Sequence, residues 1–113
     1  MSTASYPALR MRRGRSSPWI RAMLAEHRLH SSDLIWPLFV CDGADCQEPL
    51  AALPGVARWS VDRLAGKARE AAALGIPCLA LFPNTPANLR SARGEEALNR
   101  DNLMCRAIRA IKD

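Results

Sequence analysis

The segment from Gly75 to Pro86, GIPCLALFPNTP, limits the possible folds of this chain more than any other. Seven consecutive apolar residues, Ile76 to Phe82, show neither the period of a surface helix nor the alternation of a strand with one wet face. Turn-forming residues flank this run on both sides. Such a run is typical of a strand buried on both faces, as in a parallel sheet that is covered by helices.

A second apolar run, LIWPLFV at Leu34 to Val40, precedes the first. Pro37 lies in its middle, where a central strand needs every backbone N–H. Regular pairing therefore begins after it, at Leu38, or the strand is bulged there. The connection that follows Val40, CDGADCQEPLAALPGVARW, reads as a long loop of the kind that binds ligands in α/β proteins.

A helical pattern separates the two apolar runs. Ser60 offers an N-cap, and Gly75 supplies a left-handed stop at the other end. The apolar stripe has i, i+3, i+4 spacing and consists of Val61, Leu64, Ala65, Ala68, Ala71 and Ala72. The three segments predict a β-α-β unit with parallel strands and a right-handed crossover.

Two further helices are predicted on either side of this unit. Ser17 as N-cap and Pro18 at the first helical position start a short helix that runs to about Arg28 and covers one end of the sheet. A last helix starts at Asn99 or Asp101. Its expected apolar face consists of Met104, Ala107, Ile108 and Ile111.

The positive charge of the chain is concentrated near its N-terminus. The net charge of +5 arises within residues 1–30, where six arginines face the single acid Glu26, whereas the remainder is balanced. These arginines are Arg10, Arg12, Arg13, Arg15, Arg21 and Arg28. Residues 1–16 show no hydrophobic period, so we expect an extended basic arm there and the first β/α units of a larger domain in residues 17–113.

Length and composition restrict the class of protein. Two strands and three helices contain too little sheet to close a core, so 113 residues are expected to form the opening part of a larger β/α protein. No apolar segment reaches the length of a membrane span, and the arginine-rich N-terminus lacks the apolar centre of a secretory signal. We therefore expect a cytoplasmic protein that does not bind membranes.

Candidate site residues are few. Cys41, Asp42, Asp45, Cys46 and Glu48 follow the first strand, but a Cys-x4-Cys spacing without histidine matches no standard zinc pattern, so structural or incidental thiols are favoured. If Cys41 lines the end of the strand, it remains a candidate reactive thiol. Packing or solvated roles are expected for His27 and His30, and hydrophobic anchoring for Trp19, Trp36 and Trp59.

Five blocks of sequence, taken in order, resemble the N-terminal part of the δ-aminolevulinic acid dehydratase family, also called porphobilinogen synthases. The blocks are RMRRGRSSPWIRAML, DLIWPLFV, EPLAALPGVARWSVDRL, GIPCLALFP and EEALNRDNLMCRAIRAIKD. Together they cover about Arg10 to Asp113. The resemblance implies the start of a (β/α)8 TIM barrel, made of an arm, a short helix and then β-α-β-α.

The resemblance also implies an activity and partners. In the family, two molecules of 5-aminolevulinate condense with loss of water to give porphobilinogen for haem and other tetrapyrroles. Two lysines form Schiff bases with the substrates, Zn²⁺ or Mg²⁺ assists, and an N-terminal arm embraces a neighbouring subunit in a homo-oligomer, commonly an octamer. The family's lysines, metal ligands and carboxylate binders fall beyond Asp113, so no catalytic, cofactor-binding or metal-binding residue is assigned here.

The residues themselves agree with that assignment. A Schiff-base lysine needs a lowered pKa, usually through burial or a neighbouring cation. Lys67 and Lys112 are the only lysines, and both are expected on solvent-facing sides of helices. The chain alone is therefore expected to be inactive.

The arginines Arg10, Arg12, Arg13 and Arg15 leave a second interpretation open. They favour contacts with carboxylates of a neighbouring subunit, because the guanidinium group suits such pairs and no nucleic-acid-binding motif accompanies them. The alternative is a non-catalytic, truncated paralogue that acts as an assembly or nucleic-acid-binding module through this arm.

Overall fold

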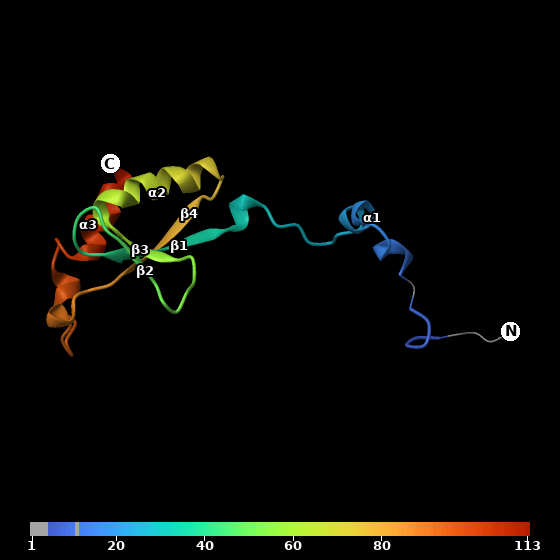
Figure 1. Cartoon of the computed structure of the whole chain (residues 1–113), viewed down its shortest axis with the longest axis horizontal. Coiled ribbons are helices and arrows are strands. Elements are labelled where there is room, and N and C mark those ends of the chain that lie inside the picture. Colours follow the sequence, from blue (N-terminus) through green and yellow to red (C-terminus); the bar gives the residue numbers. More distant parts are fainter. Residues whose placement is uncertain (1–4, 11) are drawn as a thin grey trace.

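The computed structural model describes residues 5–10 and 12–113. Its extents are 76 × 34 × 25 Å, and its radius of gyration is 22.9 Å. A compact chain of this length would have a radius of gyration of about 13 Å. The difference arises because the N-terminal part extends away from a smaller β/α body (Figure 1).

The body is built on a four-stranded sheet in the order β2-β3-β1-β4. Strand β1 (Ile35–Cys41) pairs in parallel with β4 (Cys78–Pro83), from Ile35 opposite Cys78 to Val40 opposite Pro83. These are the two strands predicted from the apolar runs, and their parallel pairing is confirmed. Pairing with β4 includes Pro37, so the expectation that pairing would start only at Leu38 was wrong on this side of the strand.

The sequence suggested that a long loop connects β1 to the first long helix, but this connection also contains two strands. It contains β2 (Gln47–Pro49) and β3 (Ala57–Ser60), which pair antiparallel with each other. Strand β3 also runs parallel to the last part of β1, with Phe39 opposite Arg58 and Cys41 opposite Ser60. The polar, Pro- and Gly-containing segment therefore returns to the sheet at the carboxyl end of β1.

Helix α2 (Val61–Ala73) connects β3 to β4 and ends as predicted. Gly75 has a φ of 73°, and the N–H groups of Gly75 and Ile76 donate to the carbonyls of Ala72 and Ala71. This pair of bonds is the Schellman motif that closes a helix on a left-handed residue. Of the predicted stripe, Leu64 and Ala71 are buried, whereas Ala72 is exposed.

Helix α3 (Leu103–Lys112) begins later than predicted, because Asn102 is its N-cap. The Asn102 side chain accepts a hydrogen bond of 2.8 Å from the N–H of Cys105. The buried face consists of Leu103 and Ala107, with Ile111 packed beside them, whereas Ile108 is exposed. The predicted face was therefore correct in Ala107 and Ile111 and wrong in Ile108.

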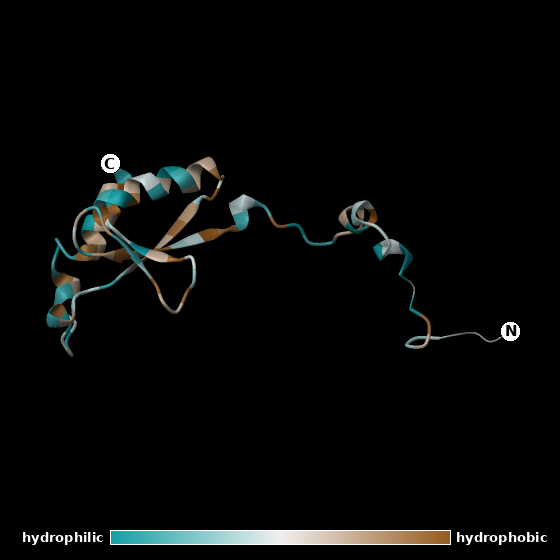
Figure 2. Cartoon of the chain, in the orientation of Figure 1, coloured by the Kyte–Doolittle hydropathy of each residue, from teal (hydrophilic) through white to brown (hydrophobic). Residues whose placement is uncertain are grey.

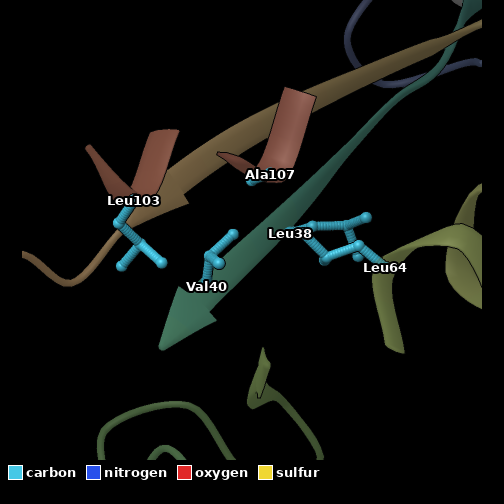
Figure 3. Close-up of a cluster of buried hydrophobic side chains, with 5 residues drawn as sticks. All are labelled: Leu38, Val40, Leu64, Leu103 and Ala107. Atoms are coloured by element: carbon cyan, nitrogen blue, oxygen red, sulfur yellow. The ribbon is translucent and has the colours of Figure 1, made fainter. Parts of the chain in front are cut away.

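Both long helices cover the same face of the sheet. Leu38 and Val40 of β1 pack there against Leu64 of α2 and against Leu103 and Ala107 of α3 (Figure 3). The opposite face carries the stacked rings of Phe39 and Phe82, whose centroids are 5.5 Å apart. Phe82 is 50% exposed and Ile35 is 61% exposed. Helices on one face only distinguish a barrel wall from a doubly wound sheet, which carries helices on both faces.

Helix α1 (Pro18–Met23) departs from the prediction in length and in position. Pro18 is at its start, as expected, but the helix ends at Met23 rather than near Arg28, and the Ser17 hydroxyl makes no capping bond. The helix packs against the short turn Arg13–Arg15 and lies at the far end of an extended segment, so it does not cover the sheet (Figure 1). The predicted arm 1–16 includes residues 1–4 and 11, which are outside the described residues.

Several large apolar side chains of this N-terminal part are exposed to solvent. Tyr6 is 77% exposed, Trp19 66% and Leu29 76%, and Met23 and Leu24 are also exposed. Figure 2 shows these apolar segments separated from the apolar strands of the body. Within the described ranges 5–10 and 12–113, no helix has both the length and the apolar character that crossing a bilayer requires.

Candidate functional site

The carboxyl ends of β1 and β4 meet at one edge of the sheet, because the two strands are parallel. In α/β proteins this edge carries the ligand-binding loops. The loop 42–46 follows β1, and the segment 84–102 follows β4 and leads to α3. These two connections form the candidate site.

Ion pairs fix the loop 42–46 to both long helices. The Asp42 carboxylate accepts a hydrogen bond of 3.0 Å from Arg106 of α3, and Asp45 accepts one of 2.6 Å from Arg63 of α2. The N–H of Asp45 also donates to the carboxylate of Asp62 at 3.0 Å. The hydrogen bond from Arg106, followed by that from the N–H of Gly43, lowers the pKa of Asp42.

Cys41 and Cys46 lie at the two ends of this loop. Cys41 is buried and Cys46 is half-buried. Burial is the main cause that raises the pKa of Cys41, and the neighbouring Cys46 acts in the same direction. A raised pKa leaves the thiol protonated at neutral pH, which makes Cys41 a weak nucleophile.

The five residues of the Cys41 to Glu48 cluster do not converge on a metal position. Asp42 and Asp45 are paired with arginines, and Glu48 accepts a hydrogen bond of 2.9 Å from Arg58. In residues 5–10 and 12–113, no group of three or more His, Cys, Asp and Glu side chains is arranged to hold a metal ion. The residues described here do not fit a Zn²⁺ or Mg²⁺ ion.

An open cavity of about 660 Å³ lies between the segment after β4 and the start of α3. Its lining includes Pro83, Thr85, Arg90, Glu96 and Asn102. Arg90 folds the segment back on itself, since its guanidinium donates to the Thr85 carbonyl at 2.7 Å and to the Asn84 side chain at 2.9 Å. These bonds are made within the segment, so no periodic pattern in the sequence reveals them.

Neither lysine has the surroundings that a Schiff-base lysine needs. The Lys67 ammonium lies 4.4 Å from the ring centre of Trp59 and forms an ion pair of 2.7 Å with Glu70. Lys67 was expected on the solvent-facing side of its helix. Instead, it is half-buried and lies against the tryptophans of the helix-covered face. Lys112 is exposed at the end of α3.

The histidines and tryptophans of the sequence analysis lie outside the site. His27 and His30 are exposed in the segment before β1, where the His30 N–H donates to the carboxylate of Asp33 at 2.8 Å. Trp36 and Trp59 pack against the core, as expected. Trp19 is exposed, so among the residues that the structure describes it does not act as a hydrophobic anchor.

The arginines of the N-terminal part are presented to solvent. Arg10, Arg12, Arg13 and Arg15 are exposed, and no ion pair formed within the described ranges involves them. The Arg15 carbonyl accepts a hydrogen bond of 2.9 Å from Arg21, which ties the short turn to α1. Charge and exposed apolar side chains therefore occur together on this part of the chain.

Comparisons with known proteins agree with this geometry. The family model of δ-aminolevulinic acid dehydratase matches residues 8–113. The dehydratase of Bradyrhizobium diazoefficiens is 50% identical over 105 residues, which are 93% of this chain and 30% of that protein. The dehydratase of Chlamydia pneumoniae is 39% identical over 92% of this chain and 31% of its own length.

A solved structure shows the same fold. The crystal structure of δ-aminolevulinic acid dehydratase (porphobilinogen synthase) from Toxoplasma gondii, in complex with the reaction product porphobilinogen, superposes with a TM-score of 0.80 at 36% identity. The match covers 92% of this chain and 29% of that one. The chain thus spans about 30% of the length of the curated relatives named here. On sequence and on structure, the chain belongs to the δ-aminolevulinic acid dehydratase family.

Proposed function

We propose that the chain is the N-terminal part of a porphobilinogen synthase, a lyase that condenses two molecules of 5-aminolevulinate with loss of water. The observation that carries the proposal is the parallel pair β1 and β4 with α2 and α3 on one face, within a segment that the family model matches from residue 8 to 113. The relative of known structure is bound to porphobilinogen.

The chain would supply wall and rim to such a barrel. Its strands bring Phe39 and Phe82 to the face that no helix covers, which is the inner face of a barrel. Its two outer helices close the outside. The loop 42–46 and the cavity beside Arg90 lie at the carboxyl edge, where barrel enzymes bind their substrates.

The chemical groups of the reaction would come from the rest of the barrel. The Lys67 side chain lies between Glu70 and Trp59, and Lys112 is exposed. The Zn²⁺ or Mg²⁺ implied by the family would take its ligands outside the residues described here. The absence of catalytic residues from this chain stays a prediction, as does its cytoplasmic location.

A chimera tests the proposal. Residues 8–113 of this chain replace the corresponding segment of the Bradyrhizobium diazoefficiens dehydratase. We expect this chimera to form porphobilinogen from 5-aminolevulinate, and the 113-residue chain alone to form none. A matched control carries Leu64→Asp, which places a charge in the core shared by α2, α3 and β1 and should abolish activity.

Failure of the chimera has a defined meaning. If the chimera folds and assembles like the parent dehydratase but forms no porphobilinogen, the chain is not a functional equivalent of the segment that it replaces. The proposal would then be wrong. A chimera that is active equally with and without Leu64→Asp would contradict the packing on which the proposal rests.

The exposed N-terminal part supports an assembly role within this proposal. Arg10, Arg12, Arg13 and Arg15 carry charge without an ion-pair partner in the described ranges, and Tyr6 and Trp19 expose apolar surface. Such a surface suits a neighbouring subunit with carboxylates and apolar pockets. The division into an arm of residues 1–16 and a barrel part of residues 17–113 stays a prediction, as does an octamer.

Light scattering of the chimera with and without the four arginines tests this role. Replacing them with Gln is expected to shift the assembly to smaller oligomers. If the oligomer is unchanged but the chain binds DNA or RNA with an affinity that falls steeply with salt, the non-catalytic alternative of a nucleic-acid-binding arm is favoured instead.

A further inference from the structure

The two edges of the sheet differ in how they are protected. Strand β2 forms one edge and has three residues, of which Pro49 has no N–H and Glu48 forms an ion pair of 2.9 Å with Arg58 of β3. The sequence suggested that the Ser60 hydroxyl caps α2, but it accepts a hydrogen bond of 2.9 Å from the N–H of Cys46 and so fixes the start of β2 to β3. A short edge with proline and charge disfavours the addition of another strand.

Strand β4 forms the other edge and lacks such protection. It has six residues, none of them charged, and proline occurs only at its last position, Pro83. The N–H of Asn84 donates to the Val40 carbonyl at 2.7 Å, so the even-numbered residues of β4 direct their backbone groups to β1. Leu79 and Leu81 therefore direct theirs to the open edge, where no other strand of the described residues pairs with β4.

The face of the sheet that no helix covers becomes more apolar toward β4. The register places Phe39 of β1 between Arg58 of β3 and Phe82 of β4, so these three side chains share that face. Arg58 is paired with Glu48, whereas Phe82 stacks on Phe39 and stays half exposed, and Ile35 is also exposed. Open backbone groups and exposed apolar side chains therefore occur together at β4.

In the relatives, most of the protein lies outside the segment that this chain matches. The matched segment is 30% of the Bradyrhizobium diazoefficiens dehydratase and 29% of the solved dehydratase chain. Because β1 and β4 are parallel and have helices on one face only, a strand that continues this arrangement runs parallel to β4 and curves over the other face. A second copy of this chain, joined edge to edge, would extend the sheet but leave the rings of Phe39 and Phe82 exposed.

We propose that β4 is a docking edge through which this chain binds the remaining part of a dehydratase barrel without a covalent link. The partner is a polypeptide of this family that lacks the segment corresponding to residues 8–113 and supplies a parallel strand with apolar side chains. The body of this chain is already formed, since Leu38, Val40 and Leu64 are buried between the sheet and its two helices. The inference rests on the proposed function and adds that the two parts of the barrel assemble as separate chains.

Co-expression tests the docking of separate chains. The 113-residue chain is produced together with a tagged Bradyrhizobium diazoefficiens dehydratase from which the corresponding segment has been deleted. We expect the two chains to co-purify in equal amounts and the complex to form porphobilinogen. Hydrogen exchange at the amides of Leu79 and Leu81 should be at least about tenfold slower in the complex than in the 113-residue chain alone, because a partner strand pairs with them.

Two pairs of variants separate docking from folding. Phe82→Glu places a charge on the docking face, whereas its control Leu74→Glu places one at an exposed leucine at the end of α2. Leu81→Pro removes an N–H that faces the open edge, and Leu81→Ala accounts for the lost side chain. Phe82→Glu and Leu81→Pro should each weaken the complex at least about tenfold relative to their controls. Circular dichroism of each 113-residue variant checks that the body is still folded.

The covalent chimera distinguishes failure of this inference from failure of the proposed function. If the chimera forms porphobilinogen but the separate chains do not co-purify, only the docking of separate chains is overturned. Equal binding by Phe82→Glu and Leu74→Glu, or by Leu81→Pro and Leu81→Ala, would overturn β4 as the docking edge. A 113-residue chain that associates only with itself would overturn the choice of partner.

Discussion

The backbone carbonyl of Val40 accepts a hydrogen bond of 2.7 Å from the N–H of Asn84. Alternate residues of a parallel strand direct their backbone groups to opposite neighbours, so Leu38 and Val40 face β4, whereas Pro37 faces the other side. There, pairing with β3 begins only at Phe39. Pro37 therefore removes no hydrogen bond from the sheet, which explains a proline inside a central strand.

The alternating direction of the backbone groups along β1 predicts opposite outcomes for proline at adjacent positions. Pro37→Ala should change the free energy of unfolding by no more than about 0.5 kcal/mol. Leu38→Pro should prevent folding, because it removes an N–H that faces β4. Urea-induced unfolding followed by circular dichroism measures both, and Leu38→Ala accounts for the lost side chain. If the Leu38→Pro chain were as stable as the Leu38→Ala chain, the backbone N–H of Leu38 would not face β4 as described.

Leu64 is the central contact between α2 and the sheet, where it is fully buried against Leu38 and Val40. Leu64→Ala should lower the free energy of unfolding by about 2 to 5 kcal/mol. Leu74→Ala, the same change at the exposed C-cap position of the same helix, should cost about 0.5 kcal/mol or less. Equal costs for the two variants in urea unfolding would contradict the described core.

The ion pair of Asp42 with Arg106 predicts a pH dependence. Because the pair lowers the pKa of Asp42 in the folded chain, it contributes stability above the pKa of an unfolded aspartate, about 3.9, and loses it as the pH falls through the lowered value. The stability difference between the chain and Asp42→Asn should therefore be constant near neutral pH and vanish in acid. In an Arg106→Gln background this pH dependence should be reduced. An unchanged dependence there would exclude Arg106 as its main cause.

Lys67 is expected to stabilise the fold and not to catalyse. Its ammonium lies over Trp59 and next to Glu70, so Lys67→Met should cost about 0.5 to 1 kcal/mol, and Lys67→Arg should restore most of it. In the chimera, Lys67→Met should leave the rate of porphobilinogen formation nearly unchanged. A loss of activity without a loss of stability would show that Lys67 takes part in the reaction.

Strands β1 and β4 and helix α2 were predictable because their signals are local. The predicted burial of both faces of the second strand was wrong, because β4 has no fully buried residue and Phe82 is 50% exposed. The run Ile76 to Phe82 identifies a strand by its composition alone, and Gly75 ends the preceding helix by a conformation that few other residues adopt. The resemblance to the family then supplied the barrel, which two strands by themselves do not specify. The structure agrees with a barrel, because α2 and α3 both cover the same face of the sheet.

What the sequence did not reveal depends on partners that are distant in the chain. Strand β3 has four residues and includes Arg58, so it shows no apolar run, and it forms because its backbone pairs with β1. Helix α1 was predicted too long, because Leu24 is apolar and follows Met23, although within the described residues Leu24 lies only against the short turn at Gly14 and stays 57% exposed.

We propose that this chain forms the first part of a porphobilinogen synthase barrel whose reactive lysines lie elsewhere. Borohydride trapping of 5-aminolevulinate on the chimera, followed by peptide mass mapping, tests both halves of it. We expect reduced substrate adducts on lysines of the Bradyrhizobium diazoefficiens portion only, and none on the 113-residue chain alone. An adduct on Lys67 or Lys112, or a folded chimera that traps no substrate, would contradict the account.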